Sequence, residues 1–250
     1  MKVTVVGCSG SYPGPDSPAS CYLLEADGFR LLLDLGSGAL GALQRHVGLY
    51  DVDAICLSHL HADHCLDLCG YHVARTYGPE APYPAIPVHA PADAPSRLAA
   101  AYGMPDEPGL ETAFDFVPLE PGCFEIGPFV LTAGLVNHPV EAYGFRVAAG
   151  GRAVAYSGDT GECEELVKLA GGADLLLCEA SFVERPGLPE GLHMTGRQAA
   201  EHAAKADVGR LVLTHLVPWN DQAAVLGDAA DGGYGGPIEL ARSGAVYDLA

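Results

Sequence analysis

Residues 58–64 of this chain read Ser-His-Leu-His-Ala-Asp-His, so three imidazoles and a carboxylate lie within six consecutive positions. Neutral histidine nitrogens and aspartate oxygens are ligands that borderline cations such as Zn²⁺ bind. The motif follows an apolar run, residues 53–57, that is typical of a buried strand. If strand geometry persists, His59 and His61 point the same way, while Asp63 and His64 turn onto the next segment toward a second ion. We interpret the motif as a metal site; the alternative is a polar surface loop in which histidines cluster by chance.

Three further potential ligands also follow apolar runs that we predict to be strands. They are His138, Asp159 and His215. Singly, each of the two histidines is better explained by an ordinary core or loop position. Because strand ends at one edge of a sheet converge, the set predicts side chains that meet in space although they are far apart in sequence.

The length and composition indicate a soluble globular protein. Its 250 residues are 49% hydrophobic and 18% charged, and a chain of this size buries about 70–75% of its unfolded surface without disulfides or partners. We expect one domain, residues 1–250. No apolar run approaches the roughly 18 residues of a membrane helix, and residues 1–7 read as a first strand, so we expect a cytoplasmic protein with no membrane partner.

The net charge is -19. Such a charge repels polyanions and argues against a long nucleic-acid footprint, which is built from Lys and Arg contacts. A small anionic substrate remains compatible, because the local field of a site decides its binding. The eight cysteines contain no C-x-x-C pair, and we interpret them as reduced, mostly core residues.

The remaining pattern alternates strands and helices without an internal repeat. The predicted strands are 2–6, 21–25, 30–34, 53–57, a short one around Val88, 114–117, 128–136, 140–147, 152–157, 174–178 and 210–214. The predicted helices are 38–46, 65–77, 94–102, 161–170 and 195–205. Asp34 ends a strand just before the first helix, so it can be an N-cap-like carboxylate, a hydrogen-bond partner of a ligand histidine, or both.

The order of these motifs resembles the metallo-β-lactamase-fold hydrolases over almost the whole chain. The shared features are His-x-His-x-Asp-His, an isolated His, Ser-Gly-Asp-Thr (157–160) and Leu-Thr-His (213–215). Within that family the chain looks most like the ribonuclease Z-related branch. Three motifs carry this resemblance: Tyr-Gly-Phe-Arg (143–146), Glu-Ala-Ser (179–181) and Leu-His-Met-Thr-Gly-Arg-Gln-Ala (192–199). The resemblance implies an α/β fold, an αββα sandwich with two zinc ions at one edge. It also implies His59, His61 and His138 on one ion, Asp63, His64 and His215 on the other, and Asp159 between them.

Such a site implies hydrolysis by a hydroxide that two divalent ions share. Asp63 can orient that hydroxide. His193 matches the histidine that protonates the leaving group in the ribonuclease branch, and it precedes a possible capping box from Thr195 to Gln198. Glu179 has two interpretations: a residue that orients His193, or a plain buried carboxylate.

Two departures from ribonuclease Z concern the substrate. The tRNA-gripping arm of that branch lies between the isolated His and the Gly-Asp, but here only 21 positions separate His138 from Asp159. The closing Ala-x-Asp-Gly is replaced by Ala-Arg-Ser-Gly at 241–244. We therefore do not expect tRNA as a partner.

A closer resemblance is to actinobacterial phosphodiesterases of this fold that hydrolyse cyclic nucleotides. It is carried by residues 5–19, 38–46 and 213–219, which lie largely outside the metal motif. Trp219, the only tryptophan, is either a stacking surface for a base or a packing residue under the C-terminal helix.

The sequence thus predicts a dinuclear-metal phosphodiesterase acting on small phosphodiesters, first on 3′,5′-cyclic nucleotides such as cyclic AMP and cyclic GMP. The alternatives are a ribonuclease Z-like RNA phosphodiesterase, a thioester or lactone hydrolase, and a metal-dependent nucleotide sensor without turnover. Zinc suits the ligands, as do manganese and iron. The family resemblance implies a homodimer.

Overall fold

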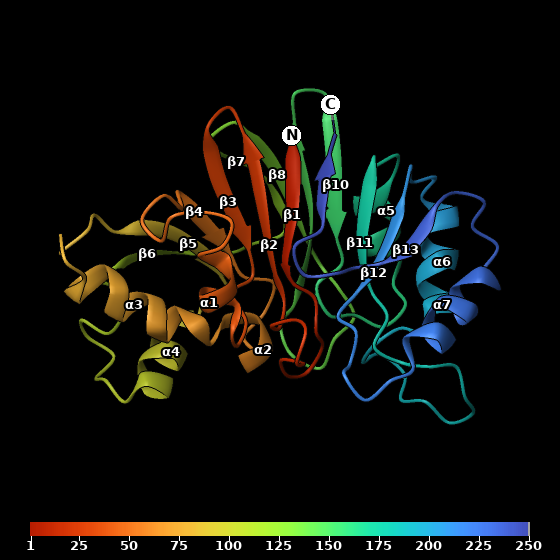
Figure 1. Ribbon diagram of the computed structural model, residues 1–250, viewed down its shortest axis with the longest axis horizontal. Helices are drawn as coiled ribbons and strands as arrows, with labels where there is room; N and C mark the ends of the chain where they lie inside the picture. Colours follow the sequence, from red (N-terminus) through yellow and green to blue (C-terminus); the bar gives the residue numbers. More distant parts are fainter. Residues whose placement is uncertain (250) are drawn as a thin grey trace.

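In the computed structural model, which describes residues 1–249, two seven-stranded sheets pack face to face and helices cover both outer faces. The first helices along the chain lie on one side of the sheets and the last three on the other (Figure 1). The predicted αββα layering is therefore confirmed.

The first sheet has the strand order β14-β1-β2-β3-β4-β5-β6. Its strands are β1 (Lys2–Gly7), β2 (Cys21–Ala26), β3 (Phe29–Leu33), β4 (Ala54–Cys56), β5 (Ile86–Ala90), β6 (Phe114–Pro118) and β14 (Val246–Asp248). Strands β3 to β6 run parallel, so their carboxyl ends share one edge. Its helices are α1 (Ala39–Leu43), α2 (Ala62–Cys65), α3 (Asp67–Tyr77) and α4 (Ala94–Tyr102).

The second sheet has the order β13-β12-β11-β10-β9-β8-β7. Its strands are β7 (Gly122–Ile126), β8 (Phe129–Leu135), β9 (Tyr143–Ala149), β10 (Arg152–Tyr156), β11 (Leu175–Glu179), β12 (Leu211–Thr214) and β13 (Ile238–Leu240), and its helices are α5 (Glu164–Ala170), α6 (Gly196–Lys205) and α7 (Gln222–Ala230). Strands β10 to β13 are parallel to one another. Their carboxyl ends therefore also share an edge.

Three apolar layers hold the sandwich together. In β3, Leu31 and Leu33 pack between the two sheets, whereas Leu32 packs outward against the helices α1 to α4. This alternation follows from the two-residue period of a strand, and the third layer lies between the second sheet and α5 to α7. Strands buried on both faces read as continuous apolar runs, which made them recognisable in the sequence.

The predicted helix over 65–77 is α3, which begins at Asp67, and a separate four-residue helix, α2, precedes it. The Asp67 N–H donates to the Leu35 carbonyl oxygen, and the Leu35 N–H donates to the carbonyl oxygen of His64. These bonds take backbone groups out of a continuous helix. A Cβ at Gly36 would clash with the Asp63 carbonyl oxygen, so this close approach requires glycine. The separation leaves Asp63 and His64 on a helix of their own.

Other predicted boundaries differ less. The helix at 94–102 is confirmed, and the helix predicted from residue 161 begins at Glu164, because Cys163 is its extended N-cap. Three strands and the short helix α2 were missed in the sequence; the strands are β7, β13 and β14. The C-terminal helix expected near Trp219 is α7, for which the sequence pattern predicted no bounds. Every helix in residues 1–249 is too short or too polar to cross a lipid bilayer.

Candidate metal and catalytic centre

The ligand residues lie where strands of the two sheets end. His59 and His61 follow β4 of the first sheet, while His138, Asp159 and His215 follow β8, β10 and β12 of the second. The strand does not persist to His59, since β4 ends at Cys56, and His61 is the extended N-cap residue of α2. A loop, and not a strand face, therefore brings the two histidines together.

Four side chains form the first cluster. His59 Nε2 is 2.9 Å from His61 Nδ1, and His138 Nε2 is 3.3 Å from the same nitrogen. Asp159 Oδ2 lies 3.6 Å from His59 Nε2. One atom from each side chain falls within 4.8 Å of all the others, close enough to share one ion.

The second cluster consists of Asp63, His64, Asp159 and His215. His215 Nε2 is 3.0 Å from Asp63 Oδ2 and 3.4 Å from Asp159 Oδ1. His64 Nε2 lies 3.1 Å from Asp159 Oδ1 and 3.6 Å from Asp63 Oδ2. Asp159 belongs to both clusters through its two oxygens. All seven predicted ligands thus come together in the two groupings that the resemblance implied.

Hydrogen bonds behind the rings turn several ligand nitrogens inward. His138 Nδ1 lies 3.0 Å from the Leu192 carbonyl oxygen, which only accepts, and His64 Nδ1 lies 2.7 Å from Asp34 Oδ2. Each Nδ1 therefore carries the proton when the imidazole is neutral, and Nε2 then keeps a lone pair that a cation can bind. On His215, Nδ1 contacts Ser181 Oγ at 2.7 Å and Nε2 faces the second cluster. Outer partners of this kind orient metal ligands.

The chemistry of the donor set fits divalent cations. His64 Nε2 and Asp159 Oδ1 are buried and have no hydrogen-bond partner, although they face each other at 3.1 Å. A lone pair facing a carboxylate oxygen is unfavourable unless a proton or a cation lies between them. Burial alone lowers the pKa of His64, but Asp159 and Asp34 outweigh it and raise that pKa well above its ordinary value. Protonation of His64 is therefore favoured in the metal-free protein, and a cation between His64 Nε2 and Asp159 Oδ1 would meet the same need.

Asp34 is a hydrogen-bond hub behind the second cluster. Its buried carboxylate accepts from the Ser58 N–H at 2.6 Å, the Ser58 hydroxyl at 2.8 Å and the Tyr156 hydroxyl at 2.7 Å, besides His64. The alternative N-cap role was wrong, because the N-cap of α1 is Gly38 and has no side-chain cap bond. The Asp34 side chain turns inward, five positions before the first residue of that helix, Ala39. Its φ of 61° lies in the sparsely populated left-handed region, as does the φ of 53° at His215. Such strain is common where a scaffold fixes a functional side chain.

His193 lies beside both clusters and is fixed by Glu179. Its Nδ1 is 2.9 Å from Glu179 Oε1, while its ring centroid lies 5.4 Å from that of His215 and 5.6 Å from that of His138. Burial alone lowers the pKa of His193, but the charge and hydrogen bond of Glu179 raise it to about 9. The imidazole is therefore protonated at neutral pH and can act as a proton donor.

Glu179 is more than a plain buried carboxylate. It is fully buried at the end of β11 and also accepts from the Thr160 N–H at 2.7 Å and the Ser181 hydroxyl at 2.9 Å. The predicted capping box is present: Thr195 caps α6, and the Gln198 side chain bonds back to the Thr195 N–H. The position of His193 is thus fixed in two ways: its ring bonds to Glu179, and its backbone is joined to the capped start of α6 two residues later.

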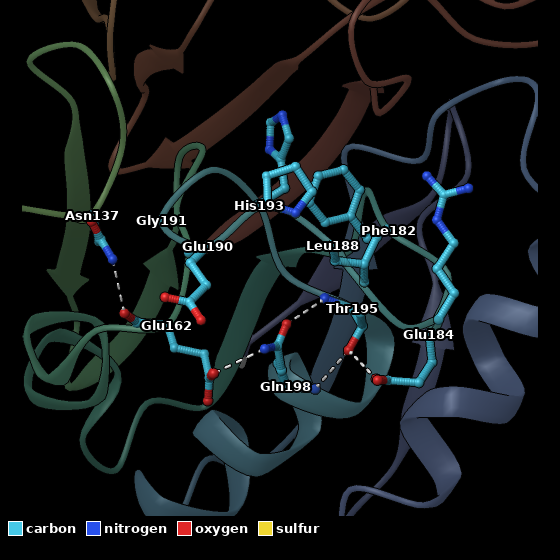
Figure 2. A pocket seen from close by; sticks show the side chains of 13 residues that line it. Asn137, Glu162, Phe182, Glu184, Leu188, Glu190, Gly191, His193, Thr195 and Gln198 are labelled. Carbon is cyan, nitrogen blue, oxygen red and sulfur yellow. Dashed lines mark hydrogen bonds between the residues drawn. The ribbon is translucent and has the colours of Figure 1, made fainter.

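Two cavities open beside His193. The first, of about 350 Å³, is drawn in Figure 2, where Thr195, Gln198 and Glu162 are linked by hydrogen bonds below His193 and Phe182. The second, of about 370 Å³, is bordered by His193, Phe182 and Trp219. Trp219 is 71% exposed, so the interpretation as a residue packed under the C-terminal helix was wrong. The helix that follows starts after Trp219 and does not cover it.

Comparison with known families decides the classification. The family described as the beta-lactamase superfamily domain matches residues 30–216. The chain belongs to the beta-lactamase superfamily.

Relatives within this superfamily cover nearly the whole chain. An uncharacterised protein of Mycobacterium leprae is 44% identical over 256 aligned positions, which cover 100% of this chain and 89% of that protein. The probable metallo-hydrolase YhfI of Bacillus subtilis is 31% identical over 99% of this chain and 100% of its own. The crystal structure of YhfI matches with a TM-score of 0.85, 29% identity and 99% coverage of both chains.

Ribonuclease Z of Myxococcus xanthus is 30% identical, with 100% of this chain and 98% of that protein covered. The alignment runs over 302 positions although this chain has 250 residues, so the ribonuclease carries insertions relative to it. In this superfamily member, the stretch from His138 to Asp159 contains only β9, β10 and their connections.

Sequence reasoning missed several residues of the centre. Ser58, Tyr156 and Ser181 contact ligands or Asp34, but a serine beside an apolar run and a tyrosine inside one look like ordinary core positions. Phe182, which meets His193 edge-on at 5.3 Å, also gave no signal. Only their membership in the motifs 58–64 and 179–181 pointed toward the two serines.

Proposed function

We propose that this protein hydrolyses small phosphodiesters, first 3′,5′-cyclic nucleotides, with the help of two divalent metal ions. The observation that carries the proposal is the His193–Glu179 pair beside both ligand clusters. A protonated imidazole at this place suits a poor alkoxide leaving group, which must be protonated as it departs.

The ions would be held by the residues of the two clusters. His59, His61 and His138 would bind one, Asp63, His64 and His215 the other, and Asp159 both. When bound, such ions lower the pKa of water toward neutrality and neutralise charge on phosphoryl oxygens. The imidazole and carboxylate donors suit Zn²⁺, with Mn²⁺ and Fe²⁺ as further candidates.

The chain's own residues supply orientation and a proton. Burial opposes ionisation of Asp63, but His215 and His64 outweigh it and keep the pKa of this carboxyl well below its ordinary value. Asp63 therefore stays an acceptor that orients the attacking water. The attacking water loses a proton to solvent, its oxygen bonds to phosphorus while the bond to the sugar oxygen breaks, and His193 Nε2 protonates that sugar oxygen. Its Nδ1 remains bound to Glu179.

Three observations support a small substrate rather than tRNA. The connection from His138 to Asp159 holds two strands and no protruding arm, the ribonuclease relative carries insertions that this chain lacks, and the net charge is -19. The cavities beside His193, of about 350 and 370 Å³, are at the lower end of the range for small-molecule sites.

A substrate panel tests the proposal. Metal-loaded protein would be assayed against cyclic AMP, cyclic GMP, 2′,3′-cyclic nucleotides, a tRNA precursor, and a thioester and a lactone. We expect turnover of 3′,5′-cyclic nucleotides above all others. Activity confined to the tRNA precursor, or to the thioester or lactone, would overturn the assignment, and binding of cyclic nucleotide without turnover would indicate a sensor.

A further inference from the structure

The two cavities beside His193 differ in chemistry. The first is lined by three carboxylates, Glu162, Glu184 and Glu190. Among the described residues around the second cavity there is no carboxylate, and Trp219 borders this cavity alone; Phe182 and Arg185 line both cavities. An anionic ligand that carries a flat aromatic group is therefore better matched by the second cavity.

Trp219 is an exposed ring on a firmly held loop. The Leu216 N–H donates to the Cys8 carbonyl oxygen at 2.9 Å, and the Gly10 N–H donates to the Leu216 carbonyl oxygen at 3.1 Å. On the other side, Asn220 Nδ2 donates to the Ser181 carbonyl oxygen at 2.7 Å. The backbone around Trp219 is thus fixed, yet 71% of the residue remains exposed. An indole fixed in this way, four positions after His215, is placed for contact with a ligand.

Tyr12 limits where a flat ligand can lie. Its ring centroid is 5.5 Å from that of Trp219, with the planes tilted by 35°. A ring inserted between two others needs a separation of about 7 Å, twice the contact distance of about 3.5 Å. A base therefore cannot enter between Tyr12 and Trp219. Tyr12 packs against the indole and does not itself border the second cavity, whereas Trp219 does.

We infer that Trp219 is the stacking platform for the nucleobase of the substrate, and that Tyr12 positions it. The inference rests on the proposed function and names the residue that recognises the base. His193 and Trp219 border the same cavity, so a substrate can place its leaving oxygen at the imidazole and its base at the indole. Stacking is tolerant of base identity, which predicts activity on both cyclic AMP and cyclic GMP.

The chain offers a direct reporter, because Trp219 is its only tryptophan. Metal-loaded protein would be titrated with AMP and, as a matched ligand without a base, with ribose 5-phosphate, while the fluorescence is followed. We expect AMP to quench the tryptophan emission. Ribose 5-phosphate should leave the emission nearly unchanged, and its ability to inhibit hydrolysis verifies that it occupies the site. Unchanged emission at saturating AMP would overturn the inference.

Kinetics of variants provide the second readout. For cyclic AMP, Trp219→Ala should raise KM by about 5- to 150-fold, the usual effect of removing one base–aromatic stack, and Trp219→Phe should restore most of the loss. KM for the corresponding cyclic sugar phosphate without a base should change little. Tyr77→Ala serves as the control, because Tyr77 is also 71% exposed but lies on α3 and does not border the cavity.

The outcomes separate the two proposals. If the wild type hydrolyses cyclic AMP but Trp219→Ala leaves KM unchanged, or raises it equally for the substrate without a base, the platform is wrong and the function stands. If the wild type hydrolyses no cyclic nucleotide, both are wrong.

Discussion

His193 and Glu179 show how one carboxylate sets the chemistry of a neighbour. Glu179 is fully buried and its oxygens accept hydrogen bonds from backbone and hydroxyl groups around it, so its charge is fixed in place. That charge raises the pKa of His193 to about 9 against the effect of burial. Two expectations at this scale concern the proton on His193.

Replacing His193 by Ala removes the proton donor. We expect the rate with an alkyl phosphodiester to fall on the order of 10²-fold or more. With a p-nitrophenyl ester, whose leaving group needs no proton, the fall should be much smaller. Steady-state rates of both substrates measure the difference. Equal losses would mean that His193 serves only the structure.

Glu179→Gln retains the shape of the side chain but removes its charge. The pKa of His193 should then fall. Because the proposed mechanism needs protonated His193, the pH above which activity declines should be lower in the variant than in the wild type. We expect the alkaline limb of the rate profile to move down by about 1–3 pH units. A limb that stays in place in the variant would exclude the assigned role of Glu179.

At the scale of elements, the centre depends on loops that leave the strands at a shared edge. The ligands were identifiable in the sequence because several His and Asp residues followed apolar runs, and β4, β10 and β12 do end just before them. The edge strands β13 and β14 could not be identified in the sequence, because each has only three residues and pairs with one neighbouring strand. The split of α2 from α3 depends on backbone bonds to Leu35, which no local pattern contains.

The start of α6 is the element that fixes His193. Thr195→Ala removes the cap and should cost about 0.5–2 kcal/mol of unfolding free energy, and it should also reduce the rate with alkyl phosphodiesters because His193 lies two residues before it. Asp221→Ala is the matched control: it removes the cap of α7 at a similar cost in stability. Urea denaturation measures stability. If both variants kept full activity, the cap would not position His193.

At the scale of the molecule, the clusters join the two halves of the sandwich. His59, His61, Asp63 and His64 come from the first half, and His138, Asp159 and His215 from the second. The fold class followed from the sequence, because the ligand order resembles one family. The tautomers set by Asp34 and Leu192, and the shape of the cavities, depend on packing between distant segments and could not be predicted.

Metal binding should therefore stabilise the whole molecule. With free metal at 1,000 times Kd, the free energy of unfolding increases by about 4 kcal/mol. For a chain of this size, that increase raises Tm on the order of 10 °C. The proton on His64, whose pKa is raised well above its ordinary value in the metal-free protein, must leave when metal binds. The difference in Tm between loaded and chelated protein should therefore shrink as the pH falls. A difference independent of pH would contradict this linkage.

We propose that two ions held by these seven side chains make the protein a cyclic-nucleotide phosphodiesterase. Metal titration of chelated protein, with conversion of 3′,5′-cyclic AMP to AMP as the signal, tests it most directly. We predict no turnover without metal and a rate that rises to a plateau at two equivalents. Protein that has bound two equivalents and leaves cyclic AMP intact would contradict the account.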